Sequence, residues 1–172
     1  MQVNTRKVAY AIVLAALGVV LGFVSIPTGL AKLNPGQAMI NVLSAVLLGP
    51  WYAVGIAFVI SVIRNAMGWG TLLAFPGSMI GALLAGFAWR WTHNLIIAAA
   101  GEVIGTGIIG ALVGAAMVAP MLMARPTALT ALIIPFLLSS LVGAVIAVVV
   151  LYALRRAGYA PDISPETVSE QA

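Results

Sequence analysis

The sequence predicts an all-α integral membrane protein built as a bundle of six transmembrane helices. The composition is 63% hydrophobic and 7% charged, whereas a soluble domain is about 45–50% apolar and about 25% charged. The mean hydropathy is +1.15, and a chain of 172 residues cannot bury that much apolar surface internally. Apolar segments also alternate with short breaks rich in glycine, proline and asparagine, which separate the expected helices.

The first expected helix covers residues 8–26 and follows the basic pair Arg6-Lys7. A signal peptide shares these features, but this stretch is long and no small-x-small cleavage site follows it. We therefore expect a retained helix. Residues 27–35 contain Pro27-Thr28-Gly29 and are expected to form a loop.

The second and third expected helices are short. Asn34-Pro35 supplies an N-cap and a first-turn proline for a helix that runs to about residue 48. After Gly49-Pro50, a third helix is expected over 51–65. Both are shorter than the roughly 20 residues that cross a typical bilayer core, so a re-entrant element is the alternative to two short spans.

The remaining chain is expected to form a loop over 67–76 and three further helices. These cover residues 77–91, 95–118 and 128–154. Trp89 and Trp91 are candidate interface anchors, and Pro135 is expected to kink the last helix. Residues 1–156 are then expected to form one six-helix transmembrane domain, and 157–172 a disordered polar tail.

The basic residues orient this bundle in the cell membrane. Six helices place both termini and two loops on one side, with Arg6, Lys7, Arg90, Arg155 and Arg156. The opposite side has Lys32, Arg64 and Arg125. The positive-inside rule therefore predicts that both termini and the tail are cytoplasmic.

Several classes of chemistry are excluded by residues that the sequence lacks. It has no cysteine and one histidine, His93, so thiolate chemistry and His-rich metal sites are not expected. Three of its four acidic residues lie in the tail, which leaves no carboxylate pair for acid–base catalysis. No glycine-rich loop leads to Lys-Ser/Thr, so the chain is not expected to hydrolyse ATP. The net charge of +4 comes without a basic run, which argues against nucleic acid. We expect no enzyme, no cofactor and no metal.

Glu102 is the acidic residue that lies within an apolar segment. An ionised carboxylate at mid-bilayer costs about 2.5–3.5 kcal/mol on insertion scales, so such a residue usually has a role. Three roles stay open: a ligand contact, a proton-coupling group, or a structural partner of Asn41 or Arg64. The neighbouring glycines and Thr106 leave space for a ligand or a helix.

Other candidate binding residues gather at the predicted outer ends of the second and third helices and in the following loop. A small heterocycle needs aromatic faces and a few fixed donors and acceptors, and this group supplies both. For Arg64 the alternative is that its side chain extends to the membrane interface. The candidate substrate-binding residues are Gln37, Asn41, Arg64, Asn65, Trp69, Thr71, Phe75, Glu102 and Thr106.

Small residues recur one helical turn apart in several of the expected helices. Such ridges let helix backbones approach closely in lipid, either within the bundle or against a partner protein. The pairs are Ala11 and Ala15, Gly18 and Gly22, Gly77 and Gly81, Gly101 and Gly105, and Gly110 and Gly114.

Three stretches of the chain resemble a known family of transport proteins. They are INVLSAVLLGPWYA at 40–53, IRN at 63–65 with LLAFPGSMIGA at 72–82, and GEVIGTGIIG at 101–110. They are similar to the ThiW family, the thiazole-precursor substrate-binding (S) components of energy-coupling-factor (ECF) transporters. The resemblance extends from the first helix to the end of the fifth.

This resemblance implies a six-helix S component that binds the thiamine precursor hydroxyethylthiazole from outside. It also implies partners, namely a transmembrane coupling protein docked on Ala11 and Ala15 and two cytoplasmic ATPase subunits. The loops around 27–35 and 67–76 would act as a lid. The chain departs from the family pattern after Gln37: the family has a histidine at the next position, and this chain has Ala38.

Two other functions stay open on the residues alone. One is a stand-alone secondary transporter or channel for a small solute, with Glu102 as the proton-coupling group. The other is a structural membrane subunit without a ligand.

Overall fold

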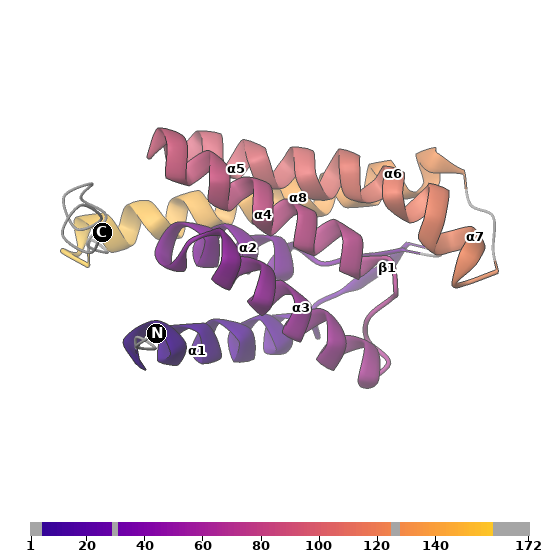
Figure 1. The fold of residues 1–172 in the computed structure, drawn as a ribbon, viewed down its shortest axis with the longest axis horizontal. Coiled ribbons are helices and arrows are strands. Elements are labelled where there is room, and N and C mark those ends of the chain that lie inside the picture. Colours follow the sequence, from indigo (N-terminus) through magenta and orange to yellow (C-terminus); the bar gives the residue numbers. More distant parts are fainter. Residues whose placement is uncertain (1–4, 29–30, 125–127, 160–172) are drawn as a thin grey trace.

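In the computed structural model, the chain is described over residues 5–28, 31–124 and 128–159, and it folds into long helices with one short hairpin (Figure 1). Residues 95–121 are a single continuous rod in which α-helical and π-helical turns alternate. In chain order the elements are α1 (Thr5–Leu21), β1 (Ile26–Thr28), β2 (Ala31–Leu33), α2 (Pro35–Leu48), α3 (Pro50–Ala66), α4 (Ala74–Thr92), α5 (Leu95–Glu102), η1 (Val103–Gly110), α6 (Ala111–Val113), η2 (Gly114–Val118), α7 (Ala119–Met121) and α8 (Leu129–Arg156).

The two ends of the bundle differ in what they carry. The start of α1 and the end of α8 lie at one end, which we call the terminal end (Figure 1). The strands β1 and β2, the start of α4 and α7 lie at the other, which we call the hairpin end. At the terminal end the guanidinium carbon of Arg155 lies 5.4 Å from the ring centroid of Trp89, which ties α8 to α4.

The predicted helices are all present, with shifted boundaries. Asn34 caps α2 as expected, since its side chain accepts from the backbone N–H of Gln37 at 3.0 Å, and Pro35 occupies the first turn. The first helix ends at Leu21 rather than near residue 26, because residues 26–28 leave it to pair with 31–33. The loop expected over 27–35 is therefore an antiparallel hairpin, in which Ile26 faces Leu33.

The fourth helix also begins earlier than expected, at Ala74, so the preceding loop is shorter than 67–76. Trp89 is buried in the core, whereas Trp91 is exposed, so only Trp91 has the exposure of an interface anchor. Pro135 lies inside α8 and is buried. The kink expected there stays a prediction, and most of the expected tail, 160–172, lies outside the described residues.

Membrane-spanning character is concentrated in the last two helical segments of the described chain. The rod Leu95–Met121 and α8 are long and apolar enough to cross a membrane, while α2 and α3 are apolar but shorter. Exposed side chains such as Leu141, Val145 and Val149 form an apolar surface on α8. This is the surface that a membrane protein presents to lipid.

Close helix packing follows the small residues that the sequence places one turn apart. A Cβ built on Gly105 would lie 2.6 Å from the Cα of Gly81, so η1 and α4 touch backbone to backbone. A Cβ on Gly101 would lie 2.9 Å from the carbonyl oxygen of Leu84. These ridges therefore pack within the bundle, which brings Glu102 against α4.

Candidate functional site

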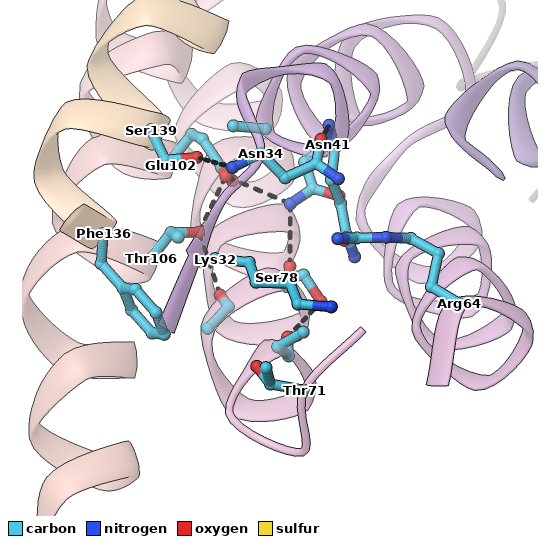
Figure 2. Close-up of a pocket in the computed structure, with 14 residues that line it drawn as sticks. Lys32, Asn34, Asn41, Arg64, Thr71, Ser78, Glu102, Thr106, Phe136 and Ser139 are labelled. Carbon is cyan, nitrogen blue, oxygen red and sulfur yellow. Dashed lines mark hydrogen bonds between the residues drawn. The ribbon is translucent and has the colours of Figure 1, made fainter. Parts of the chain in front are cut away.

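A cavity lined mainly by polar residues lies inside the hairpin end of the bundle (Figure 2). It contains about 480 Å³ of empty space, including its opening to solvent. Helices α2, α3, α4 and α8, the rod at η1, and strand β2 all contribute to it. Its lining consists of Lys32, Asn34, Gln37, Ala38, Asn41, Arg64, Thr71, Ala74, Gly77, Ser78, Glu102, Thr106, Phe136 and Ser139.

Glu102 is the acidic residue among those that line this cavity, and 0% of its surface is exposed. Its Oε1 accepts hydrogen bonds from Asn41 Nδ2 at 3.1 Å and from Thr106 Oγ1 at 2.8 Å. Its other oxygen, Oε2, has no partner among the described residues. A Cβ on Gly81 would collide with both the Glu102 carboxylate and the Thr106 hydroxyl, so this glycine makes the arrangement possible.

Of the two structural partners that the sequence offers for Glu102, the structure places Asn41 beside it. Asn41 is its structural partner, and the same amide nitrogen also donates to the carbonyl oxygen of Ser78 at 3.1 Å. Because both neighbours of that nitrogen are acceptors, the orientation of the Asn41 amide is fixed. Arg64 is not a partner of Glu102 in the described contacts, since its hydrogen bond goes to Gln37.

Arg64 lies at the end of α3 but does not extend to the membrane interface. Only 3% of its surface is exposed, and Nη1 donates to Gln37 Oε1. Gln37 Nε2 in turn donates to Ser61 Oγ at 3.0 Å, and Ser61 Oγ lies 3.1 Å from Ser78 Oγ. Together with Asn41, these side chains link Arg64 to Glu102 by hydrogen bonds across α2, α3 and α4.

The hairpin joins the cavity through Asn34 and Lys32. The backbone N–H of Asn34 donates to Ser139 Oγ on α8 at 2.8 Å, which fixes the junction between β2 and α2. Lys32 Nζ donates to the carbonyl oxygens of Gly68 at 3.2 Å and Trp69 at 2.9 Å. The hairpin is thereby bound to the loop between α3 and α4.

An aromatic contact adds to this attachment of the loop. The ring centroids of Phe23 and Trp69 lie 3.7 Å apart, with their planes tilted by 42°. The loop is also bound to the end of α3, because Asn65 Nδ2 donates to the carbonyl oxygens of Ser61 and Thr71 at 2.8 and 3.2 Å. Residues 67–73, which we call the closing loop, are therefore attached to both the hairpin and α3.

The candidate residues divide between the cavity wall and its support. Gln37, Asn41, Arg64, Thr71, Glu102 and Thr106 line the cavity. Asn65 and Trp69 do not line the cavity. Asn65 instead binds backbone carbonyls of α3 and of the closing loop, and Trp69 contacts Phe23. Phe75 also lies outside the lining, and its ring centroid is 5.9 Å from that of Phe58.

Other lining residues were not among the candidates. Phe136 supplies the aromatic ring that had been expected from Trp69 and Phe75, and Ser78 and Ser139 add hydroxyl groups. From the sequence, Lys32 is expected only as an orienting charge and Asn34 only as a helix cap, yet both line the cavity. Within the described residues, no cluster of three or more His, Cys, Asp or Glu could hold a metal ion.

Four buried polar atoms of the lining residues have no hydrogen-bond partner in the described chain. They are Asn34 Nδ2, Asn41 Oδ1, Arg64 Nε and Glu102 Oε2. Buried polar atoms in folded proteins are normally satisfied by protein, water or a ligand. Their concentration around one cavity leaves hydrogen-bonding capacity there for water or for a small polar ligand.

A second depression is apolar and lies between α1 and α3. It contains about 810 Å³ of empty space including its opening, and Ala11 and Ala15 line it. Its other lining residues are Val8, Ile12, Trp51, Tyr52, Gly55, Ile56 and Val59. We call it the α1–α3 groove.

Comparison with known proteins gives one match. Residues 8–157 match the family model described as "Thiamine-precursor transporter protein (ThiW)". No curated protein and no solved structure matches the chain.

Proposed function

The chain belongs to the ThiW family of thiamine-precursor transporter proteins, and on this premise we propose that it is the substrate-binding membrane subunit of an ECF importer. Its substrate in this proposal is hydroxyethylthiazole or a closely related vitamin precursor. The observation that supports substrate binding most directly is the cavity with its unsatisfied buried polar atoms. The protein would cross the membrane six times with both termini in the cytoplasm, so the cavity would open outward.

A thiazole alcohol suits the lining chemically. Its ring nitrogen accepts a hydrogen bond and its hydroxyl both donates and accepts, while the cavity offers an unpaired donor on Asn34 and unpaired acceptors on Asn41 and Glu102. The ring of Phe136 supplies an apolar face. Ala38 also lines the cavity, so the position where the family pattern has histidine faces the ligand in this proposal.

Energy for uptake would come from partner proteins. The sequence has no glycine-rich loop followed by Lys-Ser/Thr for ATP phosphates, so two ATPase subunits and a transmembrane coupling protein would supply it. The α1–α3 groove, with Ala11 and Ala15 half-buried in its wall, is the proposed docking site of the coupling protein. After the closing loop shuts the cavity, the whole subunit would reorient in the membrane.

Uptake of labelled hydroxyethylthiazole tests this function directly. We expect saturable uptake in cells that express the chain with the coupling protein and ATPases, and none when these partners are omitted. Equal uptake without the partners would contradict the ECF mechanism. Absence of thiazole binding by the purified protein would contradict the substrate.

The docking site has its own test. Ala11→Leu combined with Ala15→Leu fills the α1–α3 groove, so we expect loss of co-purification with the coupling protein while ligand binding is retained. Leu141→Ala on the exposed face of α8 serves as the control. Retained co-purification of the double variant would contradict docking at this groove.

One observation favours a second candidate, a secondary transporter coupled to protons. Glu102 is fully buried and keeps one carboxylate oxygen unpaired in the described chain, as a proton-carrying group could. Collapse of the proton gradient in ATP-replete cells should then stop uptake, and Glu102→Gln should do the same. Uptake that continues without the gradient would exclude this alternative.

A further inference from the structure

We propose that the part of the cavity next to the hairpin is an anion subsite, formed by Arg64, Lys32 and Asn34. It would bind a carboxylate or phosphate group carried by the thiazole-type ligand. This inference rests on the proposed function and narrows its substrate class from a neutral alcohol to an anionic derivative. Figure 2 shows the guanidinium of Arg64 pointing towards the other lining residues, with Lys32 among them.

The first support is the charge of Arg64, which is buried without an acidic partner. Its side chain is 3% exposed and its observed acceptor is the neutral amide of Gln37. Glu102 is the only acidic residue in the described chain, and its hydrogen bonds go to Asn41 and Thr106. A buried guanidinium without a counter-charge is costly, and an anionic ligand would remove that cost.

The second support is a set of donors with spare capacity. Asn34 is 5% exposed, and its Nδ2 has no partner in the described chain. The ammonium of Lys32 has three N–H donors, and the closing loop accepts two hydrogen bonds from it. One donor of Lys32 is thus left for a ligand.

Arg64, Lys32 and Asn34 are also linked to one another through shared hydrogen-bond partners. Gln37 contacts both Asn34, through its backbone N–H, and Arg64, through its side-chain oxygen. The backbone N–H groups of Trp69 and Gly70 donate to the carbonyl oxygen of Arg64 at 2.9 and 2.8 Å. Lys32 binds the same segment, so hairpin, closing loop and α3 meet at the subsite.

The chemistry of these donors selects oxyanions. A guanidinium offers a planar pair of N–H groups that matches the oxygens of a carboxylate or phosphate, and an ammonium adds a point charge. The other side of the cavity has the opposite character, because Glu102 Oε2 and Asn41 Oδ1 are unpaired acceptors. The guanidinium of Arg64, the ammonium of Lys32 and the amide of Asn34 lie on the hairpin side of the cavity, so an anionic group would bind there.

Equilibrium binding to the purified full-length chain in lipid nanodiscs tests the proposal. The probes are hydroxyethylthiazole, its phosphate ester, and the acid formed by oxidising its CH₂OH carbon to a carboxylate. We expect at least one of the two anionic forms to bind about tenfold more tightly than the alcohol at low salt. The comparison of ester with acid identifies which oxyanion the subsite takes.

Substitutions locate the preference. In Arg64→Gln the ratio of anion to alcohol affinity should fall towards one, whereas Arg64→Lys, which keeps the charge, should retain part of it. Arg90→Gln is the matched control, since Arg90 is exposed in the last turn of α4 and does not line the cavity, and it should leave the ratio unchanged.

Three results would overturn the inference. Alcohol binding as tight as or tighter than that of both anionic forms would refute the anion subsite and leave the proposed function intact. A preference that survives unchanged in Arg64→Gln would refute the assignment to Arg64. Failure of all three probes to bind would refute the proposed function, and the subsite with it.

Discussion

Two regions of this protein carry small residues one helical turn apart, and the structure uses them in opposite ways. Between α4 and η1, the backbones of Gly81 and Gly105 touch, and no space remains. Along α1, Ala11 and Ala15 line the open α1–α3 groove. The same spacing thus produces a closed contact in one place and an unfilled surface in the other.

The difference teaches that small-residue spacing predicts how closely a neighbour can approach, and not whether the neighbour belongs to the same chain. In the closed contact, the approach also creates the site, because it places Glu102 and Thr106 against the bare Cα of Gly81. In the groove, Gly55 on α3 has no atom within 4 Å of a built Cβ. Substitutions at the two regions should therefore have unlike effects.

The largest expected effect comes from adding one methyl group to the closed contact. Gly105→Ala would place its Cβ 2.6 Å from the Cα of Gly81, and we expect it to lower the free energy of unfolding by about 3 kcal/mol, because backbone cannot move aside easily. Gly55→Ala is the matched control. Without a clash, its better helix propensity should raise stability by up to about 1 kcal/mol. Denaturant unfolding in mixed micelles measures both, and equal effects would contradict the distinction between the regions.

Next in size is the loss of the carboxylate that the closed contact positions. Glu102→Ala removes the acceptor of Asn41 Nδ2 and Thr106 Oγ1, and we expect it to cost about 2 kcal/mol of stability. It should also weaken thiazole binding about tenfold or more. Glu102→Gln keeps an acceptor oxygen, so it should lose less stability and less thiazole affinity than Glu102→Ala. Denaturant unfolding measures the stability, and calorimetric titration measures the affinity. A Gln variant as impaired as the Ala variant would show that the charge, rather than the hydrogen bonds, matters.

A groove-filling substitution should have a smaller effect, confined to partner binding. Gly55→Leu projects into the α1–α3 groove, so we expect about a tenfold decrease in affinity for the coupling protein. Stability should not fall, since leucine has a better helix propensity than glycine, and ligand affinity should stay unchanged. Val145→Leu, on the exposed face of α8, is the control in the same pull-down. If Gly55→Leu unfolds the protein, the groove is not the open surface described above.

The smallest expected effect lies at the closing loop. Phe23→Ala removes the contact with Trp69, and aromatic pairs of this kind contribute about 0.5–1.5 kcal/mol. Ligand dissociation should then become about 3–10-fold faster, as measured by chase with unlabelled ligand. Phe87→Ala, which disrupts aromatic contacts with Trp51 and Trp91 instead, should leave the dissociation rate unchanged.

The helices could be predicted because proline, glycine and asparagine mark their ends so clearly. Asn34-Pro35 begins α2 as expected. The hairpin was missed because each strand has three residues, too few to show an alternating pattern. The π-helical turns of η1 and η2 were also missed, since an apolar helix facing lipid gives no periodic signal that separates 3.6 residues per turn from a wider turn.

The polar part of the cavity could be predicted better than its aromatic part. Gln37, Asn41 and Glu102 stand out because polar side chains are rare in apolar segments. Phe136 could not be predicted as a lining residue, since an aromatic residue in an apolar helix looks like any other core or lipid-facing residue. The serines also give no sequence signal of a site. Ser78 Oγ donates to the carbonyl oxygen of Ala74 in its own helix, which is a common role of serine where no ligand is bound.

The position of Trp69 has a practical consequence for studying this chain. It is one of four tryptophans, and it alone lies at the hairpin end, in contact with Phe23. The others, Trp51, Trp89 and Trp91, belong to aromatic and cation contacts at the terminal end. Intrinsic fluorescence therefore contains a component from the closing loop, and Trp69→Phe isolates it by subtraction. The protein thus carries its own optical reporter of the surroundings of the closing loop.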